Sequence, residues 1–374
     1  MTSSISLGRI FGIEIGINWS WFVVVALLVW TLASGIFPET NPGLSDGTYV
    51  AIAVVAAGLF FTSLLLHELG HALQARREGM EIDGITLWLF GGVARFKGMF
   101  PSAGAEFRIA IAGPLVSLVL GVLFVIVAFA LSGPETVDAV AAWLGYINLT
   151  LLVFNLLPAL PLDGGRVLRS ALWQRERSFT AATHHAARIG RGFGYLFIAG
   201  GIAMFVFQGS FSGAWLAFIG WFLLQAATAE DRYALVSESL RGIRVRDLMI
   251  REPVTVPADM TIGGFMDEVA WSRRYTTYPV TEDGGVVGLL AFRCVAEVPR
   301  SEWDTRRVRD CMIPRERVPA FDEDDSAVDA LAELSAADVN RGLVVENGRL
   351  AGFISITDLA RALEVAQPSQ RRAA

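Results

Sequence analysis

Apolar residues gather into six long runs within the first 231 residues, and short polar segments separate the runs. A helix needs about 20 mostly apolar residues to cross the hydrocarbon core of a bilayer. The pattern therefore predicts six membrane-spanning helices. They are expected near residues 19–36, 50–75, 109–131, 139–157, 194–207 and 214–231, with the fifth helix beginning a few residues before its apolar run.

A different pattern precedes the first predicted span. Ile13, Ile15 and Ile17 alternate with less apolar residues. A period of two is typical of a β-strand with one buried face. We therefore expect a short strand before the first membrane helix.

Positive charge divides the first 231 residues into two kinds of segment. Lys and Arg are absent from residues 10–75, 109–165 and 194–231, and each of these blocks contains two of the apolar runs. Loops rich in Lys and Arg stay on the cytoplasmic side of a membrane. The distribution predicts a multi-pass protein of the cell membrane with both termini in the cytoplasm.

Composition agrees with contact with a lipid bilayer. Charged residues make up 18% of the 374 residues, against roughly 25% in soluble domains. The net charge of −6 gives no reason to expect a nucleic-acid partner. The two cysteines, Cys294 and Cys311, form no disulfide framework in the sequence and fit a reducing compartment.

The membrane character ends near residue 231, and an internal repeat follows. VRDLM at 245–249 returns as VRDCM at 308–312, and GLLAFRCVAEV at 288–298 aligns with GFISITDLARA at 352–362. Both units contain strand-like apolar runs with a Gly-containing turn. The sequence predicts a polytopic α-helical membrane domain over 1–231 and a cytoplasmic α/β domain over 232–374. The repeats are expected at about 243–300 and 306–366.

The second apolar run contains three ionisable side chains, in the segment LLLHELGHALQA at 64–75. His67 and His71 are four residues apart, so both lie on one face of a helix, one turn from each other. Glu68 stands beside the first histidine. H-E-x-x-H on a helix is the pattern of a zinc peptidase, with two metal ligands and a general base. Ionisable residues inside membrane helices are costly and usually functional.

A catalytic zinc usually takes three protein ligands. Asp163 follows two prolines in the segment NLLPALPLDGG at 155–165, where the prolines end a helix and the irregular backbone can present a carboxylate. We favour this residue as the third ligand over its alternative role as a helix N-cap. A second source of the ligand is the polar loop after the second span, which contains Glu78, Glu81 and Asp83.

The first 230 residues resemble the site-2 protease family of intramembrane zinc metalloproteases. The likeness rests on H-E-L-G-H in the second span, N-L-L-P-A-L-P-L-D-G-G after the fourth and A-G-P at 112–114 in the third. The resemblance implies that His67, His71 and Asp163 bind one Zn²⁺ and that Glu68 is the catalytic base. It also implies that Asn155 lies near the reacting carbonyl as a further catalytic residue, with a helix–helix hydrogen bond as the alternative.

The same resemblance bears on the substrate. It places a membrane-dipping hairpin at LWLFGGVARF, residues 87–96, suited to pairing with an extended peptide. The implied partners are membrane-protein substrates such as membrane-anchored regulators, anti-sigma factors among them, cleaved near the cytoplasmic side.

Three polar residues stay outside this predicted site. Ser117 follows A-G-P-L-V, where Asn is common in the family, and the difference is expected to affect helix packing. His184 and His185 lie in an Arg-bearing cytoplasmic stretch and are interpreted as surface residues.

The tail resembles a pair of CBS domains, on the basis of the repeat, its V-R-D-x-M starts and the G-F-I-S-x-x-D ending of the second unit. In that family the Ser/Thr-x-x-Asp step contacts the ribose of an adenine nucleotide, and Ser355 and Asp358 match this step. Ala291 and Cys294 take the matching positions of the first unit, which argues against a second site. The resemblance also implies a homodimer formed through the CBS domains, and a pair without ligand is the alternative.

Together these features predict a zinc-dependent intramembrane endopeptidase for regulated intramembrane proteolysis, controlled by an adenine nucleotide at the CBS pair. The alternative is a CBS-regulated membrane transporter or channel. Such a protein needs polar or broken helices along a path, but it does not need H-E-x-x-H with a remote D-G-G.

Overall fold

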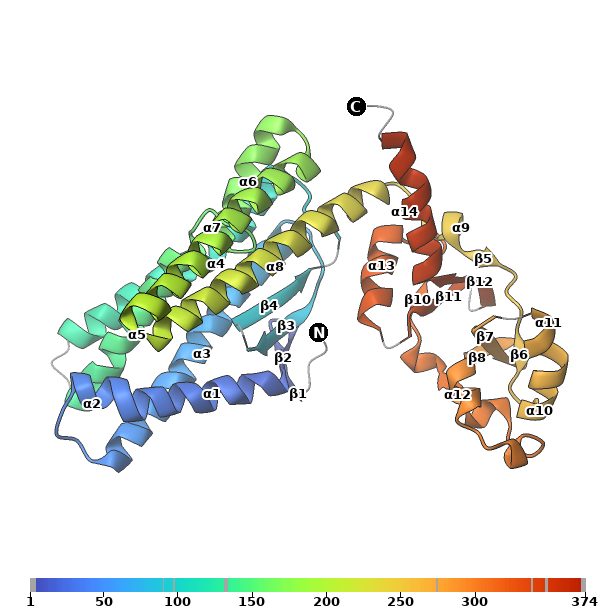
Figure 1. Ribbon diagram of the computed structural model, residues 1–374, viewed down its shortest axis with the longest axis horizontal. Coiled ribbons are helices and arrows are strands. Elements are labelled where there is room, and N and C mark those ends of the chain that lie inside the picture. The colour runs from blue at the N-terminus through green and yellow to red at the C-terminus, as the bar shows by residue number, and fades with distance from the viewer. Residues whose placement is uncertain are drawn as a thin grey trace. The chain divides into compact units, whose positions relative to one another are not determined.

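The computed structural model describes residues 5–89, 91–96, 98–130, 134–273, 275–337, 339–346 and 349–370 (Figure 1). Contacts between residues divide the chain into two compact units, Met1–Leu235 and Val236–Ala374. The first unit consists of long helices and one small sheet, and the second mixes short helices with two sheets.

The first unit is a membrane domain. Within the described residues, six helices are long and apolar enough to cross a bilayer, which confirms the six predicted spans. The first span joins α1 (Trp19–Thr31) and α2 (Phe37–Thr40) through a π-helical turn. The other spans are α3 (Asp46–Arg77), α4 (Ala103–Ala130), α5 (Glu135–Asn155), α7 (Phe179–Gln208) and α8 (Phe211–Ser239). A shorter helix, α6 (Asp163–Glu176), lies between α5 and α7 in the chain.

The fifth span departs most from its expected bounds. Its apolar run begins at residue 194, but α7 begins at Phe179, after Ser178 has capped it by accepting a hydrogen bond from the amide of Ala181. The first half of α7 carries Arg and His side chains. A helix holds its backbone hydrogen bonds whatever the polarity of its side chains, so it continues past the apolar run.

Helix α4 packs against α3, α5 and α6. A buried cluster at one end of the unit joins the first span to α3 and α5, with Leu32, Phe37, Tyr49 and Leu144 among its members. The centrality of α4 means that residues on its α3-facing side are shielded from solvent. Ile109, Gly113 and Ser117 all lie on α4 and are buried.

Four strands form a sheet beside these helices, in the order β1 (Ile5–Ile10), β2 (Ile13–Ile17), β3 (Ile82–Trp88) and β4 (Gly91–Phe96) (Figure 1). The strand predicted from the alternating isoleucines is β2, and Ile13 and Ile15 pack on Leu69 and Ala72 of α3. Strands β3 and β4 form the antiparallel hairpin expected near residues 87–96, and β4 contacts α3.

The tail unit contains two sheets, ordered β6-β7-β8-β9 and β10-β11-β12-β5. The short strand β5, at the start of the first repeat, pairs with β12 of the second repeat. The short strand β9, at the start of the second repeat, pairs with β8 of the first. The two repeats therefore exchange their entry strands. The sheets contain β5 (Ile250–Arg251), β6 (Val256–Pro257), β7 (Thr277–Glu282), β8 (Gly285–Ala291), β9 (Ile313–Pro314), β10 (Ala320–Phe321), β11 (Arg341–Glu346) and β12 (Arg349–Ser355).

Helices cover both sheets of the tail, and each repeat has its own buried cluster. A third cluster brings Leu289 of the first repeat together with Leu343 and Phe353 of the second. The tail is thus a single packed α/β unit. Its helices are α9 (Val245–Leu248), α10 (Ile262–Phe265), α11 (Trp271–Arg273), α12 (Phe292–Ala296), α13 (Ala327–Ala336) and α14 (Ile356–Gln370).

Candidate metal centre

Helix α3 carries the H-E-x-x-H segment in its last three turns. His67 and His71 are 4% and 7% exposed, and their ring centroids lie 4.8 Å apart. Gly70, between them, lies against the backbone of Ala112 in α4, where an added Cβ would approach the carbonyl oxygen to 3.1 Å. Because of this close packing, the face of α3 that carries His67 and His71 points toward the interior of the unit.

A second segment reaches the same place from far along the sequence. Helix α5 ends at Asn155, and an irregular segment leads to α6, whose first residue is Asp163. The glycines after Asp163 are required by this fold: a Cβ at Gly164 would lie 2.3 Å from the carbonyl oxygen of Leu156, and one at Gly165 would lie 2.2 Å from the nitrogen of Leu160. The segment folds back onto the first turn of α6 and fixes the direction of the Asp163 side chain.

Asp163 does not cap its helix. The N-cap of α6 is Leu162, which makes no side-chain hydrogen bond to the helix. The carboxylate of Asp163 lies instead at the two imidazoles, with Oδ2 3.2 Å from Nε2 of His67 and Oδ1 3.3 Å from Nε2 of His71. The two Nε2 atoms are themselves 3.2 Å apart.

These distances suit one ion held by three ligands. Two nitrogens bound tetrahedrally at the usual zinc distance of 2.0–2.1 Å lie about 3.3 Å from each other. Within the described residues, His67, His71 and Asp163 are the group of three whose ligand atoms all lie within 4.8 Å of one another. Two imidazole nitrogens and a carboxylate oxygen are also the donor types that zinc takes in catalytic sites. The residues present therefore fit a zinc ion.

The far sides of the two imidazoles contact α4. Nδ1 of His71 lies 2.7 Å from the carbonyl oxygen of Ile109, and Nδ1 of His67 lies 2.9 Å from Oγ of Ser117. A carbonyl only accepts hydrogen bonds, so Nδ1 of His71 is the donor and Nε2 of the neutral ring presents its lone pair to the centre. Sequence reasoning had assigned Ser117 to helix packing and had found no role for Ile109.

Glu68 lies between the centre and the sheet. A Cβ added at Gly92 of β4 would approach Cγ of Glu68 to 2.3 Å and Oε1 to 3.2 Å. The glycine thus lets β4 pass directly over the Glu68 side chain. An edge strand and a carboxylate lie together beside the three metal-ligand atoms.

The loop residues considered as alternative ligands do not belong to this group of three, and two of them, Glu81 and Asp83, are exposed. Glu78 binds Arg108 through two hydrogen bonds of 2.7 Å and accepts a third from Gln74. The Arg108 guanidinium holds the pKa of the Glu78 carboxyl below its usual value, so this carboxylate is committed to an ion pair. Asn155, which was predicted as a catalytic residue and not as a ligand, is the half-buried last residue of α5.

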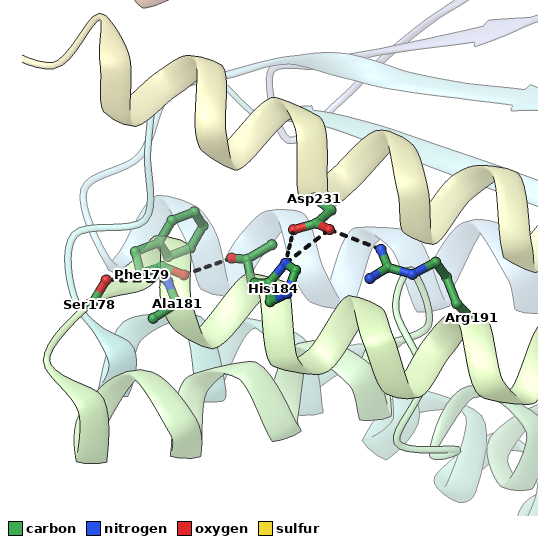
Figure 2. A network of polar contacts seen from close by, with 7 residues as sticks. Ser178, Phe179, Ala181, His184, Arg191 and Asp231 are labelled. Carbon is green, nitrogen blue, oxygen red and sulfur yellow. Dashed lines mark hydrogen bonds and ion pairs between the residues drawn. The ribbon is translucent and has the colours of Figure 1, made fainter. Parts of the chain in front are cut away.

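His184 and His185 take part in helix contacts. Asp231 of α8 accepts a hydrogen bond from Nδ1 of His184 at 3.2 Å and another from Arg191 at 2.9 Å, so it joins two turns of α7 (Figure 2). Nδ1 of His185 lies 2.9 Å from Glu176. Both histidine side chains are about half exposed, at 45% and 50%, as expected for surface residues.

A buried ionic cluster lies further along α6. Arg169, which is 2% exposed, contacts Glu106 of α4 at 2.5 Å and Glu230 of α8 at 3.1 Å. The ring of Phe179 lies 4.8 Å from the guanidinium carbon. One side chain thus ties the helix that begins with Asp163 to two membrane spans. The sequence offered no signal for this cluster, because its members come from three separate helices.

In the tail, Ser355 and Asp358 meet at the start of α14. Oγ of Ser355 donates to Oδ2 of Asp358 at 2.6 Å. A cleft of about 410 Å³ opens within the same unit, and Arg341 donates to Thr276 at 2.6 Å across it. Its walls come from both repeats: Thr276, Thr277, Ala291, Phe292, Arg293, Val339, Asn340 and Arg341.

Sequence comparison agrees with both units. Residues 55–142 and 134–199 match Peptidase family M50, and residues 245–299 and 308–365 match the CBS domain. The chain is 38% identical over 375 residues to a Mycobacterium tuberculosis protein named zinc metalloprotease Rip3, covering 99% of this chain and 95% of that protein. It is 35% identical to the zinc metalloprotease sll0528 of Synechocystis, covering 97% and 96% of the two chains.

Two solved structures match parts of the chain. The site-2 protease from Methanocaldococcus jannaschii matches with 28% identity and a TM-score of 0.42, covering 61% of this chain and 95% of that one. The CBS domain of a bacterial CNNM/CorC family Mg²⁺ transporter, solved in complex with ATP, matches with 22% identity and a TM-score of 0.33. That match covers 36% of this chain and 97% of that one.

The six spans, the histidine pair and the sequence matches define a class: a multi-pass membrane metalloprotease with a CBS tail. The chain belongs to Peptidase family M50, the site-2 proteases, and carries a tandem pair of CBS domains. This finding confirms the predicted family and enzyme class. It also favours the peptidase over the alternative of a CBS-regulated transporter or channel.

Proposed function

We propose that this protein is an intramembrane endopeptidase that cleaves transmembrane segments of other membrane proteins near the cytoplasmic face. The observation that carries the proposal is the group formed by the buried His67 and His71 and the partly buried Asp163 in a six-span unit, with Glu68 beside it. Asp163 directly precedes the cation-bearing segment 166–193, which favours the cytoplasmic half of the membrane. The same charge distribution supports a topology with both termini in the cytoplasm.

Each residue of the site has its own task in this proposal. His67, His71 and Asp163 hold zinc, which when bound lowers the pKa of water and polarises the scissile carbonyl. Glu68 accepts the proton of the attacking water and delivers it to the leaving amine. Asn155 donates an amide hydrogen bond to the oxygen on which negative charge develops. Its location at the end of α5, just before the segment that carries Asp163, is compatible with this role.

The substrate is proposed to bind as an extended strand. A helical peptide hides its carbonyls in backbone hydrogen bonds, so it must open before cleavage. Strand β4 is at the edge of its sheet, and its Gly92 lies against Glu68. A segment that adds to β4 passes beside the proposed base. Membrane-anchored regulators such as anti-sigma factors are the substrate class that the family resemblance suggests.

The tail is proposed to bind an adenine nucleotide and to link two copies of the chain. The contact between Ser355 and Asp358, and the neighbouring cleft with Arg293 and Arg341, offer partners for a ribose and for phosphates. Titration of the full chain with ATP and AMP tests this assignment. A rise in the melting temperature that Asp358→Asn abolishes supports it, and no rise with either nucleotide contradicts it.

The peptidase activity can be tested without a known substrate. Membranes from cells that express the wild type or Glu68→Gln are compared by mass spectrometry for new N-termini inside single-span helices. We expect a set of such N-termini in the wild type alone, while both proteins retain zinc. Identical N-termini in the two samples contradict the proposal. Ion flux through liposomes that persists in Glu68→Gln would favour the alternative function of a transporter or channel.

A further inference from the structure

Both imidazoles of the metal centre have a fixed partner on the side away from Asp163. Nδ1 of His71 contacts the carbonyl of Ile109 at 2.7 Å, and Nδ1 of His67 contacts Oγ of Ser117 at 2.9 Å. Both partners are buried, with Ile109 1% and Ser117 3% exposed. Water therefore does not compete freely for either ring nitrogen.

The partners belong to one face of α4. Ile109, Gly113 and Ser117 follow at intervals of four, so they occupy successive turns on the same side of the helix. Gly113 is essential to this arrangement, because a Cβ there would lie 2.2 Å from Nε2 of His71 and 2.6 Å from Nε2 of His67. Both rings therefore pack against the turn of α4 at Gly113, which has no side chain. Ile109 lies one turn before Gly113, and Ser117 lies one turn after it. The glycine of the A-G-P motif therefore lies at the metal centre.

The two partners differ in chemistry. The carbonyl of Ile109 can only accept, which leaves His71 a single neutral tautomer in this contact. The hydroxyl of Ser117 can accept or donate, and it accepts from Nδ1–H of His67 when its own proton goes elsewhere. When zinc occupies Nε2, the neutral ring of His67 carries its proton on Nδ1, and Ser117 is then the acceptor.

We propose that Ser117 is a positioning residue for the metal centre. It accepts the hydrogen bond from Nδ1–H of His67, which directs the Nε2 lone pair toward the ion and fixes the plane of the ring. The inference rests on the proposed zinc site and extends it to a residue on a third helix. Partners of this kind set the tautomer of metal-binding histidines, and their loss weakens metal affinity.

Ser117→Ala tests the proposal, and Ser63→Ala is the matched control. Ser63 is a serine of α3 with 4% exposure, and its hydroxyl bonds the carbonyl of Leu59 one turn back. Its removal leaves no imidazole without a partner. Zinc affinity of the full chain in detergent is measured by competition with a chelator. We expect about a 10- to 100-fold loss in Ser117→Ala and no comparable loss in Ser63→Ala.

A second measurement separates positioning from a general effect on folding. The chain contains four histidines, so ¹⁵N labelling of histidine gives a simple spectrum, and His67→Gln assigns the signals of His67. In the zinc-loaded wild type we expect a proton on Nδ1 of His67 that exchanges slowly with water, because it is hydrogen-bonded to the buried Ser117. In Ser117→Ala we expect this proton to exchange faster, with the Nδ1–H proton of His71 unchanged.

The outcomes distinguish this inference from the proposed function. A wild type that binds zinc, together with Ser117→Ala that keeps the same affinity and the same His67 spectrum, overturns the role of Ser117 alone. A wild type that binds no zinc when metal is supplied overturns the proposed function. In that case a difference in the ¹⁵N signals of the His67 ring between the wild type and Ser117→Ala still reports the contact between these two residues.

Discussion

Oδ1 of Asp163 lies 3.3 Å from Nε2 of His71, although Asp163 begins α6 and His71 lies near the end of α3. This contact closes the candidate metal centre across two segments that are distant in sequence. Replacing Asp163 by Asn keeps the size of the side chain but removes its charge. We expect zinc affinity to fall by more than the roughly 10- to 100-fold that an outer hydrogen-bond partner is worth. Elemental analysis of the purified full chain measures the bound zinc.

The control for that experiment is Glu78→Gln, in the loop that offered alternative ligands. Glu78 is held by Arg108 and Gln74, so its change should leave the zinc content as it is. Zinc lost from Glu78→Gln but kept in Asp163→Asn would move the third ligand to this loop.

Glu68→Gln should separate metal binding from catalysis. The amide keeps the packing of the side chain against Gly92 but cannot take a proton from water. A general base contributes roughly 10²- to 10⁴-fold to rate, so we expect a loss of that order with zinc content unchanged. Cleavage rates and zinc content are measured on the same preparations, and zinc lost with the activity would argue against the role of a base.

Two glycines should give distinct defects when changed to alanine. At Gly113 a Cβ meets both Nε2 atoms of the histidines, so zinc binding should be lost. At Gly92 it meets the side chain of Glu68, so activity should fall while zinc stays bound. Gly58→Ala in α3 is the control, because nothing lies within 4 Å of the added Cβ. Equal zinc content in all three variants would contradict the arrangement of the centre.

The cluster around Arg169 should matter for stability. Removing one partner of a buried ion pair leaves an uncompensated charge and costs about 3–5 kcal/mol. We expect this destabilisation for Arg169→Met, observed as a lower melting temperature of the full chain in detergent. Arg108→Gln breaks an ion pair whose arginine is 54% exposed, and exposed pairs contribute little to stability, so we expect a much smaller shift. Equal shifts for the two variants would show that burial does not set the strength of these pairs.

One carboxylate of the tail, held in two ion pairs, should make stability depend on pH. Arg244 and Arg246 both bind Asp324 and hold the pKa of its carboxyl below the usual value. A carboxyl with a lowered folded-state pKa stabilises the protein above its unfolded pKa, about 3.9, and loses this contribution as pH falls through the folded value. An NMR titration should find a lowered pKa in the wild type, and a return toward the usual value in Arg244→Gln.

The architecture of the membrane unit could be predicted because a bilayer imposes a simple rule on sequence. Long apolar runs gave the six spans, and the alternation at Ile13 to Ile17 gave β2. The helix ends could not be found in this way. Helix α7 continues through Arg and His side chains, where hydropathy carries no information about the backbone.

The metal centre was predictable in part for a related reason. His67 and His71 are four residues apart, a spacing that brings two side chains together on one face of a helix. Asp163 lies in a segment rich in Pro and Gly, which indicates irregular backbone. The contact of His71 with Ile109 left no trace in the sequence, because every residue has a carbonyl. In the sequence Ser117 differs from a family pattern but shows no link to the centre, because its contact with His67 depends on how α3 and α4 pack.

Because the proposed metal ligands are divided between α3 and α6, they are synthesised at different times. The chain is made from its N-terminus, so His67 and His71 are synthesised well before Asp163. A catalytic zinc takes three protein ligands, and two histidines alone do not complete the set. The proposed centre can therefore be completed only after the fourth span has been made and α6 has followed it. A ribosome-bound precursor that ends before α6 carries the peptidase signature but not the means to cut its neighbours in the membrane.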